Sequence, residues 1–168
     1  MVIVLACPHA STPDVCEACR YEEIRRNLIL DPTQITRAAT LVRNAARQMV
    51  GADGITFVIV EGDHVFYVEE DAAGPLWKGQ RFPMELCVSG WVIRHGQRVS
   101  IPDVYADSRV HHPAYRTTFV QSMAMVPVGL TPAIGAVGAY WATRHEATEA
   151  ELTTLQALAD SAFLAMAV

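Results

Sequence analysis

Four residues near the start of the chain have the types and spacing to hold a metal ion. Cys7, His9, Cys16 and Cys19 supply three thiols and an imidazole, which fit a tetrahedral zinc site. The Cys-x-x-Cys spacing of the last two lets both sulfurs reach one ion, whereas the Cys-x-His spacing of the first two is tighter than in common zinc fingers. The alternatives are a disulfide, a tail with incidental cysteines and an iron–sulfur cluster. Zinc is therefore the cofactor that this segment predicts.

A second candidate site surrounds the tripeptide Ser89-Gly90-Trp91, where the pattern predicts the start of a short helix capped by Ser89. Free backbone N–H groups at a helix start favour an anion, and a glycine there permits close approach of a ligand. We expect these residues to bind a small anion or a carboxylate-bearing metabolite. Five more residues could wall or close the pocket: Tyr105, Tyr115, Arg116, Phe119 and Met123. The alternative is that Trp91 and Phe119 are ordinary core residues.

Other reactive side chains give weaker indications of chemistry. Cys87 precedes the predicted helix, and a nearby helix start can lower a thiol pKa, although buried cysteines are commonly inert. His111 and His112 could bind a metal or an anion, but adjacent histidines on a loop point apart, which favours a surface loop. No catalytic Ser-His-Asp order, phosphate loop or carboxylate pair stands out. We therefore expect no enzymatic activity, with a Cys87-dependent enzyme as the alternative.

The composition excludes several classes of partner. The chain has 168 residues, about half of them apolar, which suits one domain with a real core. A net charge of −5 and the lack of a basic run argue against nucleic acid and anionic membranes as partners. The apolar start before Cys7 lacks the charge and length of an export signal, and no stretch reaches the roughly 18 apolar residues of a membrane span. We expect a cytoplasmic protein.

Local patterns predict the elements that must position these residues. Asp31 with Gln34, and Thr148 with Glu151, form capping boxes that open two long amphipathic helices. Between them, β-rich runs alternate with glycine and proline, and a polar loop covers residues 106–118. The predicted helices span residues 21–30, 32–50, 89–96 and 148–166, and the predicted strands span 55–60, 65–69, 99–101, 122–128 and 133–142.

The order of these elements predicts an α+β fold. Hairpins form a central antiparallel sheet, the terminal helices pack on one face, and crossover segments form a pocket on the other face. The chain divides at Asp31-Pro32 into a cysteine-bearing leader, residues 1–30, and a globular domain, residues 31–168. The initiating methionine and the unusual leader favour a stand-alone chain over an excised piece.

Several blocks of this sequence, in the right order, resemble GAF domains of bacterial sensor histidine kinases. They cover residues 82–96, 101–109, 114–128, 134–141 and 155–160. The resemblance implies the α+β sensor fold and a small ligand, and it implies that terminal helices pair between subunits. Three known GAF activities look absent: no cysteine follows the His111 loop as in bilin-binding members, the Asn-Lys signature of cyclic-nucleotide binders is missing, and Cys87 alone cannot supply the cysteine set of free methionine sulfoxide reductases.

We therefore expect a small-molecule-binding sensor domain in signal transduction, as in two-component systems, without catalytic output of its own. The alternative is a metal- or redox-responsive switch that uses the leader cluster. Helices 32–50 and 148–166 carry wide apolar stripes, which predict a homodimer. A histidine kinase or another signalling protein is the expected partner.

Overall fold

The first helix of the described chain starts and stops where its capping residues predict. The computed structural model describes residues 30–130 and 133–167. Helix α2 (Pro32–Val50) begins after Asp31, whose carboxylate accepts a backbone N–H of the first turn, and a capping box completes this end. The helix ends at Gly51, which has a φ of 62°. Glycine adopts this left-handed conformation without the steric cost that a Cβ brings.

The last helix, α5 (Glu149–Met166), has the same design. Thr148 and Glu151 bond reciprocally in the expected capping box, which satisfies N–H groups that the first turn leaves without helical partners. The described domain therefore begins and ends with two helices whose capping residues the sequence predicted. Among the described residues, no helix is long and apolar enough to cross a membrane.

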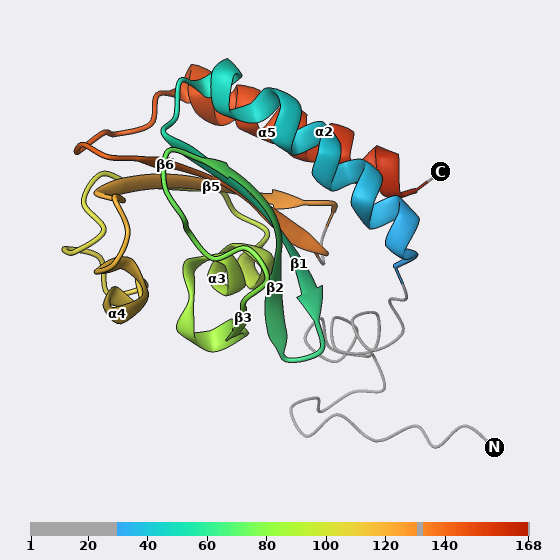
Figure 1. Ribbon diagram of the computed structural model, residues 1–168, viewed down its shortest axis with the longest axis horizontal. Helices are drawn as coiled ribbons and strands as arrows, with labels where there is room; N and C mark the ends of the chain where they lie inside the picture. Colours follow the sequence, from blue (N-terminus) through green and yellow to red (C-terminus); the bar gives the residue numbers. More distant parts are fainter. Residues whose placement is uncertain (1–29, 131–132, 168) are drawn as a thin grey trace, which may run out of the picture.

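The chain between these two helices forms one antiparallel sheet of six strands (Figure 1). Its order is β3-β2-β1-β6-β5-β4, so the hairpin near each end of the chain lies against the other in the centre of the sheet. The strands are β1 (Gly54–Glu61), β2 (His64–Ala72), β3 (Arg81–Pro83), β4 (Val99–Ile101), β5 (Ser122–Val128) and β6 (Gly135–Trp141). The predicted α+β fold class is confirmed, and β4 and β5 have the predicted bounds.

The sequence did not predict three short elements. They are β3, the 3-10 helix η1 (Met84–Leu86) and helix α4 (His112–Tyr115), each of three or four residues. So short a segment cannot display a helical or strand periodicity. The predicted short helix does form as α3 (Val88–His95), and it ends at Gly96 with a φ of 60°.

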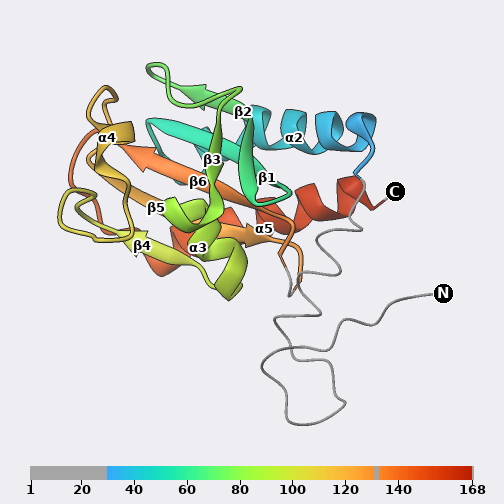
Figure 2. The same cartoon turned by 90° about the horizontal axis from the view of Figure 1, so that it is seen from below.

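The two faces of the sheet are covered differently, as Figures 1 and 2 show. Helices α2 and α5 lie side by side along one face, which we call the helix face. Helices α3 and α4 and the connection at residues 73–80 lie on the opposite side, which we call the loop face. Side chains alternate along each strand, so Phe57 of β1 points to the helix face and Val58 to the loop face. The expected arrangement of terminal helices and crossover segments is confirmed.

The predicted leader lies outside the described residues, apart from Leu30. This applies to the helix expected over residues 21–30 and to the whole leader cluster of cysteines and histidine. The division of the chain into residues 1–30 and 31–168 stays a prediction.

Candidate functional site

Four aromatic rings meet in the interior of the loop face. The Trp77 ring lies at the centre, with ring centroids 4.7 Å from Tyr115, 5.4 Å from Tyr140 and 5.5 Å from Tyr67. The four residues come from four separate segments: β2, the 73–80 connection, α4 and β6. Each is buried. We call this group the Trp77 cage.

A single carboxylate holds the connection that carries Trp77. Glu70 of β2 accepts hydrogen bonds from the backbone N–H groups of Leu76, Trp77 and Lys78, at 3.2, 2.9 and 2.9 Å. Charge-assisted bonds of this kind are stronger than neutral ones. The indole N–H of Trp77 donates to the carbonyl oxygen of Ala114 at 3.1 Å, which joins this connection to α4.

A chain of polar side chains runs through the same interior. The hydroxyls of Thr56 and Tyr140 lie 3.0 Å apart, and those of Tyr67 and Ser89 lie 3.3 Å apart. Ser89 in turn donates to the thiol sulfur of Cys87 at 3.2 Å. Buried hydroxyls need such partners, because an unpaired one costs free energy.

The hydroxyl of Tyr115 has a weaker partner than the others. Its acceptor is the thioether sulfur of Met123, at 3.5 Å, although Tyr115 is only 6% exposed. A thioether is a poor hydrogen-bond acceptor. Among the cage residues, the hydroxyl of Tyr115 would therefore gain the most favourable free energy from bonding to an oxygen or nitrogen acceptor of a ligand.

Burial keeps these groups in their neutral forms. Desolvation raises the pKa of Tyr67, Tyr115 and Tyr140 above that of an ordinary tyrosine, and the charge of Glu70 adds to the effect on Tyr140. Burial also raises the pKa of Cys87, although the hydroxyl of Ser89 and the backbone N–H of Gly90 act in the opposite direction. The cage therefore offers phenol donors and a protonated thiol.

The structure corrects two details of the site predicted at Ser89-Gly90-Trp91. The cap lies two residues earlier, at Cys87, and helix α3 begins at Val88, so Ser89 is not the cap. A Cβ added to Gly90 would lie 1.7 Å from the carbonyl oxygen of Met84. Gly90 therefore admits the protein's own backbone rather than a ligand, and η1 packs against the start of α3 where an anion was expected.

The predicted ligand-binding residues separate into two groups. Tyr115 and Met123 are buried and meet inside the loop face. Trp91 is half-buried and stacks on His95, with ring centroids 4.2 Å apart, while the guanidinium of Arg109 lies 4.9 Å from its ring centroid. These surface contacts are distinct from the cage.

The remaining three predicted residues lie toward the periphery. Tyr105 is 41% exposed and Arg116 is also exposed. Phe119 is half-buried, and its ring would lie 3.0 Å from a Cβ added to Gly54. The structure thus does not bring all eight residues into one pocket, and their role in ligand binding stays a prediction.

The predicted metal and anion residues give no cluster in the described part of the chain. His112 bonds to the backbone carbonyl of Asp107 at 3.3 Å, and the carboxylate of Asp107 pairs with Arg109 at 2.6 Å. No group of three His, Cys, Asp or Glu side chains among residues 30–130 and 133–167 could hold a metal ion. The zinc prediction concerns residues outside these ranges.

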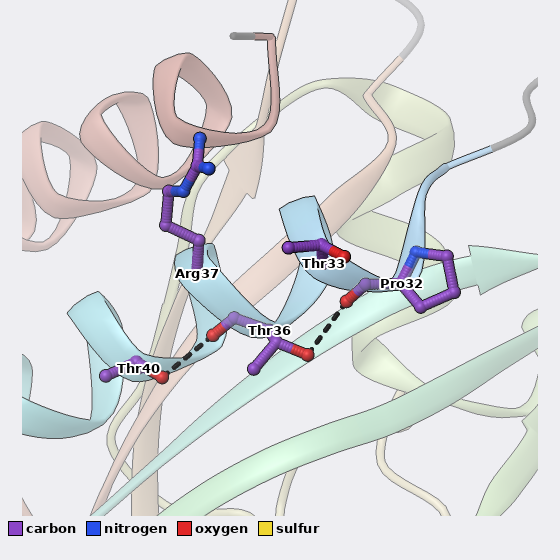
Figure 3. Close-up of a pocket in the computed structure, with 5 residues that line it drawn as sticks. All are labelled: Pro32, Thr33, Thr36, Arg37 and Thr40. Atoms are coloured by element: carbon purple, nitrogen blue, oxygen red, sulfur yellow. Dashed lines mark hydrogen bonds between the residues drawn. The ribbon is translucent and has the colours of Figure 1, made fainter.

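Two surface hollows lie away from the cage. The first, of about 560 Å³, follows the start of α2 and is lined by Pro32, Thr33, Thr36, Arg37 and Thr40 (Figure 3). The hydroxyls of Thr36 and Thr40 donate to backbone carbonyls of the same helix, at 2.8 Å each, so they are already engaged. The second hollow is lined by Gly96, Gln97, Arg98, Pro127 and Gln156.

Several cage residues were absent from the sequence prediction. The sequence places Tyr67 and Tyr140 only in predicted strands, and it places Trp77 and its partner Glu70 in no predicted site. Strand parity carried a usable signal, because Val65 and Tyr67 must share a face. The position of the Tyr140 ring depends on strand pairing. Thr56 of β1 pairs with Gly138 of β6, and the Tyr140 side chain lies over Gly138, where an added Cβ would be 2.5 Å from the Tyr140 hydroxyl.

Comparisons with known proteins agree with this fold. A family model described as GAF domain matches residues 32–167. Free methionine-R-sulfoxide reductase from Neisseria meningitidis, solved with its substrate, is 19% identical with a TM-score of 0.66, covering 88% of this chain and 86% of that one. The GAF domain of Acinetobacter phosphoenolpyruvate-protein phosphotransferase is 14% identical with a TM-score of 0.67, covering 90% of each chain.

The GAF-B domain of DevS from Mycobacterium smegmatis is a further similar structure. It is 20% identical with a TM-score of 0.64, and the match covers 82% of this chain and 93% of that one. At these identities the likeness concerns the fold. No curated protein sequence matches the chain.

The expectation that the chain has no enzymatic activity is corrected by these comparisons. It rested on the lack of familiar catalytic motifs, yet free methionine-R-sulfoxide reductases share this fold. Because some proteins of this fold are enzymes, the lack of familiar catalytic motifs in this chain does not show that it only binds a ligand. The match over residues 32–167 and the six-stranded sheet show that the chain belongs to the GAF domain family, whose members generally act as small-molecule-binding sensors.

Proposed function

We propose that this domain is a sensor that binds a small molecule at the Trp77 cage. The observation that carries the proposal is the concentration of hydrogen-bonding groups in the interior of the loop face. Thr56 and Ser89 are fully buried there beside three buried tyrosines, and the half-buried Cys87 adds its thiol. Burying each hydroxyl costs free energy unless it is paired. Ligand sites combine apolar walls with a few placed polar groups, as this interior does.

The covering segments favour the loop face as the side where a ligand enters. Trp77 and Tyr115 stand on a loop and a one-turn helix, whereas α2 and α5 are long helices packed on each other. Short connections open at a lower free-energy cost than long packed helices. A ligand could therefore enter by displacing these segments while the sheet and the long helices stay folded.

The central strands supply a route for a signal. Thr56 bonds to Tyr140 on the loop face, while its neighbours Ile55 and Phe57 pack on the helix face. A ligand that moves Tyr140 would act on the strand that also contacts α2. We propose that α2 and α5 pass ligand occupancy to a partner.

The finer assignments made from sequence belong to this proposal. They comprise a homodimer formed through α2 and α5, a histidine kinase or other signalling partner in a two-component system, and a cytoplasmic location. Met49 and Leu164 on these helices are 59% and 64% exposed, which supports the dimer. Zinc at Cys7, His9, Cys16 and Cys19, with its metal- or redox-switch alternative, stays a prediction for the leader.

The test begins with native mass spectrometry of protein purified without denaturation, followed by thermal-shift screening of small metabolites. Two variants that each remove one buried hydroxyl then locate the site. Tyr115→Phe alters the cage, while Ser122→Ala removes a hydroxyl that bonds to Thr143 away from it. We expect Tyr115→Phe to weaken ligand binding about tenfold, the effect of one good hydrogen bond, and Ser122→Ala to leave it unchanged. Equal effects of both variants, or no bound molecule by either method, would contradict the proposal.

A further inference from the structure

Trp77 occupies the centre of the proposed site, and its place in the chain differs from that of a comparable core tryptophan. Trp141 is also buried and also donates its indole N–H to a backbone carbonyl, that of Gly51, at 3.1 Å. Trp141 lies within β6 and is paired with Ser122 of β5. Trp77 instead stands on the connection between β2 and β3. Its ring can leave the interior without breaking a strand pair.

The connection that carries Trp77 has conformational freedom at both ends. Gly74 precedes Trp77 and Gly79 follows it, the latter with a φ of 84°. The connection is held by the carboxylate of Glu70, by backbone bonds of Tyr67 with Gly79 and Gln80 at 2.8 and 3.0 Å, and by the bond from the Trp77 indole to Ala114. These attachments fix Trp77 between three tyrosine rings, and its departure can leave the central strands β1, β6 and β5 paired, which makes it a local event.

The Trp77 ring itself indicates what this space accepts. It is a planar, uncharged heteroaromatic ring whose N–H finds a carbonyl acceptor on Ala114. The rings of Tyr67, Tyr115 and Tyr140 meet it in tilted or edge-on arrangements, which are favourable geometries for aromatic pairs. A ligand of the same shape could keep these contacts.

The charges around the cage disfavour an anion. The nearby carboxylate of Glu70 acts on Tyr140, and the guanidinium of Arg109 is already paired with Asp107. Among the described residues, the fully buried polar side chains at the cage are hydroxyls. An anion placed there would lose its hydration without gaining a counter-charge. The carboxylate-bearing metabolite expected from the sequence therefore fits poorly.

We propose that the ligand of this site is an uncharged, planar heteroaromatic molecule that takes the place of the Trp77 indole. A ring N–H of the ligand donates to the carbonyl of Ala114, and a ring nitrogen or carbonyl oxygen accepts from Tyr115, replacing the thioether of Met123. This inference rests on the proposed function, because it names the ligand class of the same site.

Matched probes test the ligand class on the wild-type protein by calorimetry. Benzamide should bind at least about tenfold tighter than benzoate, because they share a ring and differ in charge. Benzimidazole should bind about fivefold tighter than indole, because both carry the N–H and only benzimidazole adds a nitrogen acceptor. Tyr115→Phe should abolish that second preference while keeping the first. Benzoate binding as tightly as benzamide would overturn the proposal.

A pair of tryptophan variants tests the position of the ligand. Trp77→Ala should bind indole at least about tenfold tighter than wild type, because the space is vacated and no side chain must be displaced. Trp141→Ala is the matched control, since it empties a similar volume on the helix face, away from the cage, and should not show this tenfold gain in indole affinity. If Trp77→Ala fails to fold, Trp77→Leu retains more of the packing and should show the same direction. Equal gains in both variants would overturn the proposal.

The outcomes separate this inference from the proposed function. A copurified ligand that is charged, and whose binding depends on Tyr115, would refute the ligand class and leave the sensor site standing. Absence of any ligand, together with no effect of Tyr115→Phe on probe binding, would refute both.

Discussion

The two faces of the sheet are built from the same strands but differ in the side chains that they bury and in the segments that cover them. The helix face is filled by aliphatic side chains such as Val42, Ala46 and Leu155 beneath two long capped helices. The loop face buries three tyrosines and the chain of hydroxyls beneath short segments. The helix face shows that this sheet can be covered mainly by aliphatic side chains, with the hydroxyl of Ser122 and the indole N–H of Trp141 bonded to backbone carbonyls at its edge. The polar interior of the loop face therefore points to binding, and the helix face to scaffolding and communication.

The largest expected effect concerns the boundary of the loop face. Gly90→Ala places a Cβ 1.7 Å from the Met84 carbonyl oxygen, and a backbone atom cannot move aside easily. We expect a loss of about 3 kcal/mol or more in the free energy of unfolding, measured by urea denaturation. Gly74→Ala is the control, since its nearest atom lies at an ordinary 3.6 Å. A stable, unaltered Gly90→Ala variant would show that η1 does not pack on α3 as described.

The second effect tests whether the helix face is purely structural. Leu155 is 1% exposed, so Leu155→Ala should cost about 3 kcal/mol of stability through the cavity that it leaves. Probe affinity at the cage should not change, because this side chain lies on the opposite face. Leu130→Ala makes the same truncation at an 82% exposed position and should cost under about 0.5 kcal/mol. A large change in probe affinity in Leu155→Ala would contradict the idea that the helix face has a structural role and takes no part in ligand binding.

A smaller effect concerns the attachment of Trp77. Glu70→Gln replaces a carboxylate that accepts three backbone N–H bonds by a neutral amide with one acceptor oxygen. We expect a loss of about 1–2 kcal/mol in unfolding experiments and tighter binding of indole, because Trp77 is then displaced more easily. The exposed Glu146→Gln variant should show neither change. Weaker indole binding in Glu70→Gln would mean that the probe needs Trp77 in place.

The smallest effect is one of reactivity and leaves stability unchanged. Burial raises the pKa of Cys87, so at neutral pH the folded protein holds this thiol protonated, and its thiolate fraction grows as pH rises. Peptide mapping after brief iodoacetamide treatment should show Cys87 alkylated at least about tenfold more slowly than in the urea-unfolded chain. The difference should shrink as the pH is raised. Alkylation of Cys87 at the unfolded rate would contradict its burial.

The sequence predicted the helix face more fully than the loop face, for physical reasons. The caps at Asp31 and Thr148 are local signals, and strand alternation fixes which side chains of β1 face the long helices. The Trp77 cage depends on contacts between residues far apart, such as the bond from Trp77 to Ala114, which no local pattern encodes. Gly90 shows the same limit, because its spacing suggested a ligand where the chain places its own Met84.

The most direct test of the account follows the indole N–H signals of the ¹⁵N-labelled domain by nuclear magnetic resonance. Benzimidazole, or a ligand identified by native mass spectrometry, is titrated into the wild-type protein. Trp77 and Trp141 are both buried and both donate to a backbone carbonyl, so each reports on one face. We expect the Trp77 signal to shift or disappear with saturation while the Trp141 signal stays within its linewidth. A shift of Trp141 alone, with Trp77 unmoved at saturation, would contradict this expectation.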